Sequence, residues 1–230
     1  MRPASLSRAL KTASELLEKR IEHLSSGLEE LDRLLAGGFP KGKISEVTGP
    51  ASSGRTSLVF SAIALASAAG ENIAYIDTFN VFDPVSAAQS GIYLPRVLWI
   101  RCNGSIEKGV AAVDILARAG GFGMLVWDTA PPDEKPRQAD RDRAPTHAWF
   151  RLKQAVEGSK SVLLVLGLKP MAGSAASVVV RVNRTSAVWI PELAARERKS
   201  LRRPGFFKGL AFETEIQKGG SCGIRVHRRI

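Results

Sequence analysis

Five short apolar runs alternate with segments of helical periodicity through the middle of the chain. The runs predict buried strands over residues 44–48, 72–77, 97–102, 124–128 and 161–168. The periodic segments predict helices over residues 28–35, 56–69, 84–90, 106–118 and 146–157. Strands that alternate with helices predict right-handed crossovers and a mostly parallel sheet. The expected fold class is therefore α/β, with helices flanking a central sheet.

The two ends of the chain have a different pattern. Apolar residues recur at helical spacing over residues 5–24 and predict an amphipathic helix, which packs either on its own domain or on a neighbouring subunit. Near the C-terminus, stretches without long helices between them predict strands over residues 178–182, 187–190, 211–217 and 223–227. We expect these strands to extend the sheet or to form an antiparallel edge. The predicted organisation is an N-terminal helix (1–24), a core (25–195) and a basic, strand-rich extension (196–230).

The composition limits the class of protein and agrees with the predicted fold. The 230 residues, 44% hydrophobic and 24% charged, suit one domain with a sizeable core. The longest apolar runs are far too short to cross a bilayer, and residues 1–24 lack a signal-peptide pattern. Two cysteines and three scattered histidines predict neither a disulfide framework nor a metal site. We therefore expect a cytoplasmic protein.

Positive charge is concentrated at the C-terminal end. The formal net charge is +11, and residues 196–230 hold ten Lys or Arg against three Glu, a difference of +7. A basic end segment favours an acidic partner, most often nucleic acid. The candidate contacts are the cations of one run: Arg196, Arg198, Lys199, Arg202 and Arg203. The alternative is a solvated basic loop that contacts no partner.

A phosphate-binding motif lies between the first predicted strand of the core and the helix after it. The sequence VTGPASSGRTS, residues 47–57, has the glycine, cation and hydroxyl spacing of a P-loop. Such a loop surrounds a phosphate with backbone N–H groups at a helix N-terminus. The candidate contacts are Gly49, Ser52, Ser53, Gly54, Arg55, Thr56 and Ser57. Thr56 stands where P-loops hold Mg²⁺, whereas Arg55 replaces the usual lysine. Because arginine is longer, planar and forked, we expect phosphate binding to persist more readily than hydrolysis.

Asp128 ends the predicted strand MLVWD, residues 124–128. A carboxylate at this place fits a Walker B residue that orients Mg²⁺ through water, so ATP and Mg²⁺ are the expected cofactors. The alternative is an ordinary strand-end aspartate that caps a turn. The Pro-rich, charged segment 130–145 follows directly. It predicts a loop at the edge of the sheet where α/β proteins place ligand contacts.

Two stretches resemble the RecA/RadA recombinases. Residues 25–58, SSGLEELDRLLAGGFPKGKISEVTGPASSGRTSL, are similar to the opening of the RecA core, and residues 74–84, AYIDTFNVFDP, are similar to its next strand. The similarity covers roughly residues 25–190. It implies a RecA-like P-loop core, ATP dependence and DNA strand exchange, and it places Asp83 at the position that contacts adenine.

Several positions depart from the RecA pattern. Phe79 stands where RecA has its catalytic glutamate, and a phenyl ring cannot orient an attacking water. Where RecA ends a later strand with an Asn-Gln sensor of the γ-phosphate, residues 165–168 read Val-Leu-Gly-Leu. The segments that correspond to the two DNA-binding loops of RecA, 131–145 and 169–175, are short. These losses predict weak or absent ATP hydrolysis and no strand exchange, so we assign no catalytic residue.

The pattern of losses, with the chain length, resembles the ImuA family of RecA-like accessory proteins. That resemblance implies a scaffold in DNA damage tolerance and repair, serving SOS-type mutagenic translesion synthesis. It implies as partners a Y-family polymerase-like protein similar to ImuB and an error-prone replicative-type polymerase, with DNA and a second copy of the chain as further partners. The alternatives are an active DNA-dependent ATPase or recombinase mediator of the RecA/RadA type and a small regulatory nucleotide sensor. An active ATPase needs another acid in place of the glutamate, and Glu46 and Asp77 are the acids available.

Overall fold

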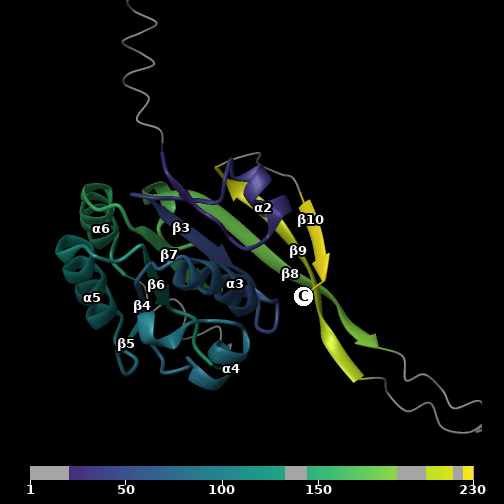
Figure 1. The fold of residues 1–230 in the computed structure, drawn as a ribbon. Coiled ribbons are helices and arrows are strands. Elements are labelled where there is room, and N and C mark those ends of the chain that lie inside the picture. The colour runs from purple at the N-terminus through teal and green to yellow at the C-terminus, as the bar shows by residue number, and fades with distance from the viewer. Residues whose placement is uncertain (1–20, 133–143, 191–205, 220–224, 230) are drawn as a thin grey trace, which may run out of the picture.

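A computed structural model describes residues 21–132, 144–190, 206–219 and 225–229 (Figure 1). Its strands are β1 (His23–Leu24), β2 (Phe39–Pro40), β3 (Ile44–Thr48), β4 (Ile73–Asp77), β5 (Val97–Arg101), β6 (Met124–Asp128), β7 (Val162–Gly167), β8 (Ala176–Ile190), β9 (Phe206–Lys218) and β10 (Arg225–Arg229). Its α-helices are α2 (Glu29–Leu34), α3 (Arg55–Ala68), α4 (Pro84–Gln89), α5 (Ile106–Ala119) and α6 (Thr146–Gly158). Two 3₁₀ turns, η1 (Leu94–Arg96) and η2 (Gly173–Ala175), complete the described elements.

Eight of the described strands form one sheet in the order β10-β9-β8-β3-β7-β6-β4-β5. The neighbours from β8 to β5 pair in parallel, whereas β9 is antiparallel to β8 and β10 is antiparallel to β9. Strands β1 and β2 form a separate antiparallel pair. The predicted α/β class, with a mostly parallel sheet and antiparallel strands at the C-terminal end, is confirmed.

Helices cover both faces of this sheet, and each face has its own apolar core. On one face α2, α3 and α4 pack against residues such as Val47, Tyr75 and Leu164. On the other face α5 and α6 pack against residues such as Ile76 and Trp127. Every residue of β3, β4, β6 and β7 is buried. Continuous apolar runs, rather than alternating ones, are what a parallel sheet covered on two sides requires.

The parallel register brings four strand ends together. Thr48 at the end of β3 pairs with Gly167 at the end of β7. Asp128 at the end of β6 pairs with Leu166 on one side and with Asp77 of β4 on the other. Residues 49–57, which follow β3, therefore begin at an edge where two carboxylates also lie. This is the edge at which α/β sheets bind ligands.

The structure corrects the predicted N-terminal helix over residues 5–24. Residues 1–20 lie outside the described ranges, but the end of the prediction is wrong, because His23 and Leu24 form β1 and pair with β2. Leu24 is buried in the core on the α3 face. The Leu24 side chain thus belongs to a strand that packs in the core.

A second correction concerns β8. The sequence predicts two strands, 178–182 and 187–190, but the structure has one strand from Ala176 to Ile190. Its register with β9 shifts between Arg184 and Ser186. Such a bulge keeps the polar stretch within the ladder, so a loss of apolar alternation does not end the strand.

The C-terminal extension joins the sheet of the core. The predicted boundary at residues 195 and 196 lies outside the described ranges, within the connection from β8 to β9. Strand β9 pairs with β8 along most of its length, and its Ile216 and Thr214 side chains are buried. No helix within the described ranges is both long enough and apolar enough to cross a membrane.

Candidate nucleotide-binding site

Two glycines determine the conformation of residues 49–57, which we call the phosphate loop. Gly49 has a φ of 153° and approaches β8 so closely that a Cβ would lie 2.1 Å from the Val182 carbonyl oxygen. Gly54 has a φ of 99° and is the N-cap residue of α3. Side chains other than hydrogen are strained in such conformations. The motif glycines are therefore required by the backbone of this strand–loop–helix turn.

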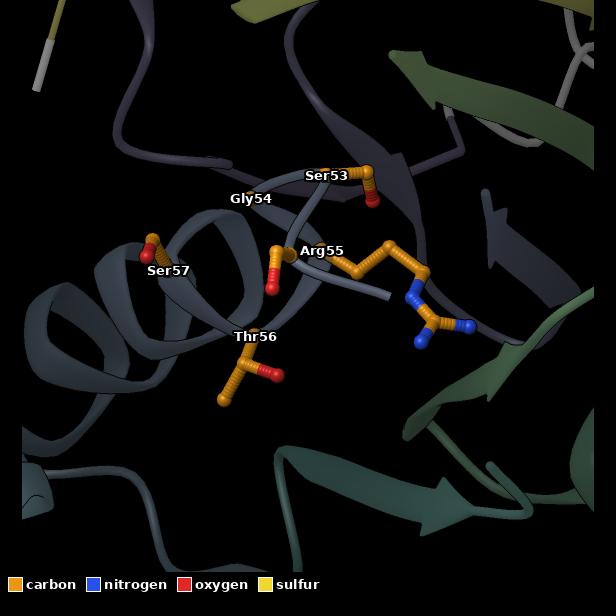
Figure 2. Close-up of a pocket in the computed structure, with 6 residues that line it drawn as sticks. Ser53, Gly54, Arg55, Thr56 and Ser57 are labelled. Carbon is orange, nitrogen blue, oxygen red and sulfur yellow. The ribbon is translucent and has the colours of Figure 1, made fainter. Parts of the chain in front are cut away.

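The phosphate loop encloses a hollow of about 140 Å³ lined by residues 52–57 (Figure 2). Thr56 is exposed and Ser57 is half-buried. The Ser53 Oγ atom is buried and has no hydrogen-bond partner among the described residues. A glycine-rich turn at the N-terminus of a long helix favours anions. The residues present therefore fit a bound phosphate group.

Arg55 extends from the first turn of α3 to the end of β7. Its Nη1 atom donates a hydrogen bond of 2.7 Å to the Gly167 carbonyl oxygen. The backbone N–H of Gly49 donates to the same oxygen at 3.3 Å. Figure 2 shows the Arg55 side chain extended away from Ser57 toward the neighbouring strands. The cation of the motif thus links the phosphate loop to the strand that lacks the Asn-Gln sensor.

Asp128 is buried at the end of β6, with 4% of its surface exposed. Its Oδ2 atom accepts a hydrogen bond of 2.8 Å from the Tyr75 hydroxyl, and its Oδ1 atom accepts one of 3.0 Å from the backbone N–H of Ala130. Burial raises the pKa of Asp128, against the opposing effects of these two hydrogen bonds and of the positive charge of Arg55. The turn-capping contact is present in the structure, and the metal-side role stays a prediction.

Tyr75 is a site residue that the motif spacing does not predict. It lies in β4 with 1% of its surface exposed, and its ring packs on Phe82 with the centroids 4.4 Å apart. Burial and the neighbouring Asp128 carboxylate raise the pKa of Tyr75 well above its ordinary value, so the hydroxyl stays a donor. A tyrosine in a fully buried strand needs a hydrogen-bond partner for its hydroxyl, so Tyr75 in the apolar run 72–77 indicates that a polar group lies nearby.

Asp77, one of the two acids considered as replacements for the glutamate, fixes the turn after β4. Its carboxylate accepts hydrogen bonds from the backbone N–H groups of Val81 and Phe82 at 3.0 and 2.9 Å. The Trp99 Nε1–H donates to it at 3.1 Å. Asp77 is 0% exposed. Its three donors and its burial give it a structural role in holding this turn.

Glu46, the other acid considered, holds the short segment 169–175. Its Oε1 atom accepts hydrogen bonds from the backbone N–H groups of Met171 and Ala172 at 2.7 and 3.0 Å. Burial raises the pKa of Glu46, while these backbone bonds and the charge of Lys218 lower it. Lys218 also donates to the carbonyl oxygens of Gly173 and Ser174 at 3.1 and 3.4 Å. The segment that corresponds to the second DNA-binding loop is thus attached to β3 and β9.

Asp83, the predicted adenine contact, caps helix α4. Its oxygens accept hydrogen bonds from the backbone N–H groups of Val85 and Ser86, both at 3.1 Å, and from the Ser86 hydroxyl at 2.5 Å. The Ser86 bonds lower the pKa of Asp83. This side chain is exposed. The capping role is a finding, and the adenine contact stays a prediction.

Comparison with known proteins identifies the family. The family model of the RecA N-terminal domain matches residues 8–135, more than half of the chain. The chain belongs to the RecA N-terminal domain family. It is similar to the RecA protein of Bacillus mycoides, with 28% identity over 180 residues, and to that of Lactobacillus johnsonii, with 28% identity over 186 residues. These matches cover 78% and 80% of this chain and 48% of each relative, so the chain spans about half the length of these curated relatives.

The fold of this RecA-family chain also resembles a solved structure, the RadB recombinase. The two superpose with a TM-score of 0.64 at 20% sequence identity, covering 90% of this chain and 96% of the other. At this identity the likeness concerns the fold alone. It agrees with the predicted RecA-like core.

Besides the short segment 169–175, two predicted departures from the RecA pattern can be located in the structure. Phe79 is half-buried in the turn that Asp77 fixes. At the end of β7, the main-chain oxygen of Gly167 receives Arg55 where the resemblance places an amide sensor. Most of the segment 131–145 lies outside the described residues, and so does the whole basic run from Arg196 to Arg203. Their predicted contacts with DNA or protein partners stay predictions.

Proposed function

We propose that this RecA-family chain is an accessory scaffold protein in DNA damage tolerance, where it serves mutagenic translesion synthesis. In this proposal it binds a nucleotide in the phosphate loop and hydrolyses it weakly or not at all. The observation that carries the proposal is the burial of Glu46 and Asp77, the two acids available to replace the missing catalytic glutamate. Glu46 and Asp77 are 1% and 0% exposed, and backbone N–H groups donate to both oxygens of Asp77 and to Oε1 of Glu46. A general base must reach the water that it activates.

The proposed ligand is ATP, with its phosphates in the hollow formed by residues 52–57. Gly49 and Gly54 support phosphate binding through the backbone conformation that they permit. On the metal side, the exposed Thr56 is available, whereas Asp128 is buried and holds Tyr75 and Ala130. A bound nucleotide would contribute negative charge and order to this edge of the sheet. Binding without turnover suits a scaffold whose shape depends on its ligand.

The proposed partners are a Y-family polymerase-like protein and an error-prone replicative-type polymerase, with DNA as a further ligand. This part rests on the resemblance to the ImuA family and on the basic run in the connection from β8 to β9. A net positive end segment supports contact with nucleic acid or with an acidic protein surface. Binding to DNA through this run should weaken steeply with salt, because phosphate neutralisation releases counterions.

Steady-state ATP hydrolysis tests the nucleotide part of the proposal. The purified protein should show weak turnover or none with Mg²⁺-ATP, and single-stranded DNA should not increase it. Turnover that depends on DNA and disappears in Thr56→Ala would contradict the proposal and favour an active ATPase. Thr56 is exposed, so this substitution should leave the fold intact.

A co-purification assay with polymerase-type partners tests the scaffold part. Removing residues 196–230 would be an unsuitable variant, because β9 is part of the sheet and its Ile216 is fully buried. The sharper variant replaces the five cations of the run, from Arg196 to Arg203, by serine. Loss of partner or DNA binding with an unchanged melting temperature would support the run as the contact surface. Unchanged binding would exclude the run as the contact surface.

A further inference from the structure

The position of Arg55 gives the phosphate loop a fixed positive charge of its own. The residue lines the hollow, and its guanidinium is anchored by the 2.7 Å hydrogen bond to Gly167. The same group is close enough to Asp128 to counteract the rise of that carboxyl group's pKa. Arginine keeps its charge at every physiological pH, and its planar fork matches phosphate oxygens. Arg55 therefore supplies a fixed positive charge that acts both at the phosphate loop and on Asp128.

The same edge offers a poor environment for a divalent cation. Both oxygens of Asp128 already accept hydrogen bonds, from Tyr75 and from Ala130. The positive charge of Arg55 favours the ionised form of Asp128, as a metal ion would in a metal-dependent site. A second cation placed beside Arg55 would meet like-charge repulsion in a partly buried site, where screening is weak. These residues fit a phosphate better than they fit phosphate together with Mg²⁺.

We propose that Arg55 takes the place of Mg²⁺ as the counter-charge in this site, so that the loop binds a nucleoside polyphosphate without a divalent metal. This inference rests on the proposed nucleotide binding and specifies its chemistry. Mg²⁺ normally neutralises the β- and γ-phosphate oxygens and helps to activate them for transfer. A guanidinium that is held by Gly167 neutralises the same charge but coordinates no water for attack. The Arg55 side chain would then support binding without contributing to hydrolysis.

Equilibrium binding of ATP, measured by calorimetry with the full chain, tests this inference. One titration contains excess EDTA and the other contains Mg²⁺. For the wild-type protein we expect dissociation constants that agree within about threefold, because the fixed cation serves in both conditions. Arg55→Ala should weaken binding in EDTA by about tenfold or more, and Mg²⁺ should restore part of that loss, since the ion then supplies the missing charge.

The control variant is Arg118→Ala, at the C-terminal end of α5 and so near the opposite edge of the sheet. Arg118 is exposed and paired with Asp114, and its removal should change neither titration. A melting curve of each variant shows whether it is folded, and the wild-type comparison needs no variant at all. Wild-type binding that Mg²⁺ tightens by about tenfold or more would overturn the inference and leave the proposed nucleotide binding intact. Absence of binding in both conditions would overturn the two together.

Discussion

The phosphate loop and the ends of β4 and β7 lie at one edge of the sheet but differ in what they retain. The loop keeps the strand–loop–helix turn, both glycines with positive φ and the open hollow of a phosphate site. Around the ends of β4 and β7, polar groups instead hold the protein together: Asp77 fixes a turn, and Gly167 receives Arg55. Phosphate binding and phosphate chemistry depend on different residues, so one can be lost while the other persists. Substitutions at both places test this contrast, beginning with the most damaging one.

Asp77→Ala should be the most destabilising of these changes. It removes a fully buried carboxylate and leaves the N–H groups of Val81, Phe82 and Trp99 without their acceptor. We expect a loss of about 4 kcal/mol in the free energy of unfolding, measured by urea titration. The control is Asp114→Ala, whose ion pairs with Arg118 of α5 and Arg151 of α6 involve exposed arginines, with an expected loss under about 1 kcal/mol. A loss at Asp77 no larger than that of the control would contradict its structural role.

Gly49→Ala should damage the phosphate loop itself. The new methyl group would lie 2.1 Å from the Val182 carbonyl oxygen at a φ of 153°. Strain and overpacking together should cost about 3 kcal/mol and abolish ATP binding. Gly158→Ala is the matched control, because its Cβ would meet no atom within 4 Å and its φ is not positive. Retained stability and binding in Gly49→Ala would show that the loop does not need this close approach.

Tyr75→Phe isolates the contact between Tyr75 and Asp128. The change removes one buried donor to a carboxylate and leaves the ring packing in place. We expect a loss of about 1.5 kcal/mol in thermal or urea unfolding. Tyr93→Phe, on an exposed tyrosine with 56% of its surface accessible, should have no measurable effect. Equal effects of the two substitutions would exclude a structural contribution from the Tyr75 hydroxyl.

Glu46→Gln should have the smallest effect, visible as a dependence on pH. The folded-state pKa of Glu46 lies above its ordinary value of 4.5 because burial disfavours the charged form. The folded state then binds more protons than the unfolded state, so the wild-type protein loses stability as pH rises from 4.5 through the folded pKa. Glutamine does not titrate, and the stability of the variant relative to wild type should therefore increase with pH over this window.

Glu157→Gln supplies a control of opposite sign for this pH dependence. Its hydrogen bond from Lys43 lowers the pKa of Glu157 below 4.5. That stabilisation is present above the ordinary pKa and is lost as pH falls through the folded pKa. The variant should thus become less stable than wild type as pH rises. The same sign of pH dependence for both variants would contradict the buried environment assigned to Glu46.

Most of the fold could be predicted because it depends on local pattern. The strands β3 and β6 have the predicted bounds, and α3 begins within one residue of its prediction. Continuous apolar runs bounded by glycines permitted this. For β8 and β9 the sequence predicts only strands that extend the sheet or form an antiparallel edge. It does not predict that β8 continues through its polar stretch, because the bulge that permits this leaves no mark on the residue spacing.

The chemistry of the site was predictable only where it is local in sequence. Gly49, Gly54 and the residues between them form a continuous segment, and its spacing indicates a phosphate turn. The bond from Arg55 to Gly167 joins residues 112 positions apart, and the bond from Tyr75 to Asp128 joins residues 53 positions apart. Such contacts depend on strand order and on side-chain reach. The motif spacing therefore predicts the phosphate loop but not the contact of the Arg55 side chain with Gly167.

A single-turnover experiment asks whether the protein binds ATP without hydrolysing it. The protein is mixed in excess over trace labelled ATP, and bound label and ADP formed are measured in the same samples over time, with and without single-stranded DNA. We expect the label to be bound to saturation while the ATP remains intact. ADP that accumulates at the protein's own rate, faster with DNA and absent in Gly49→Ala, would contradict it.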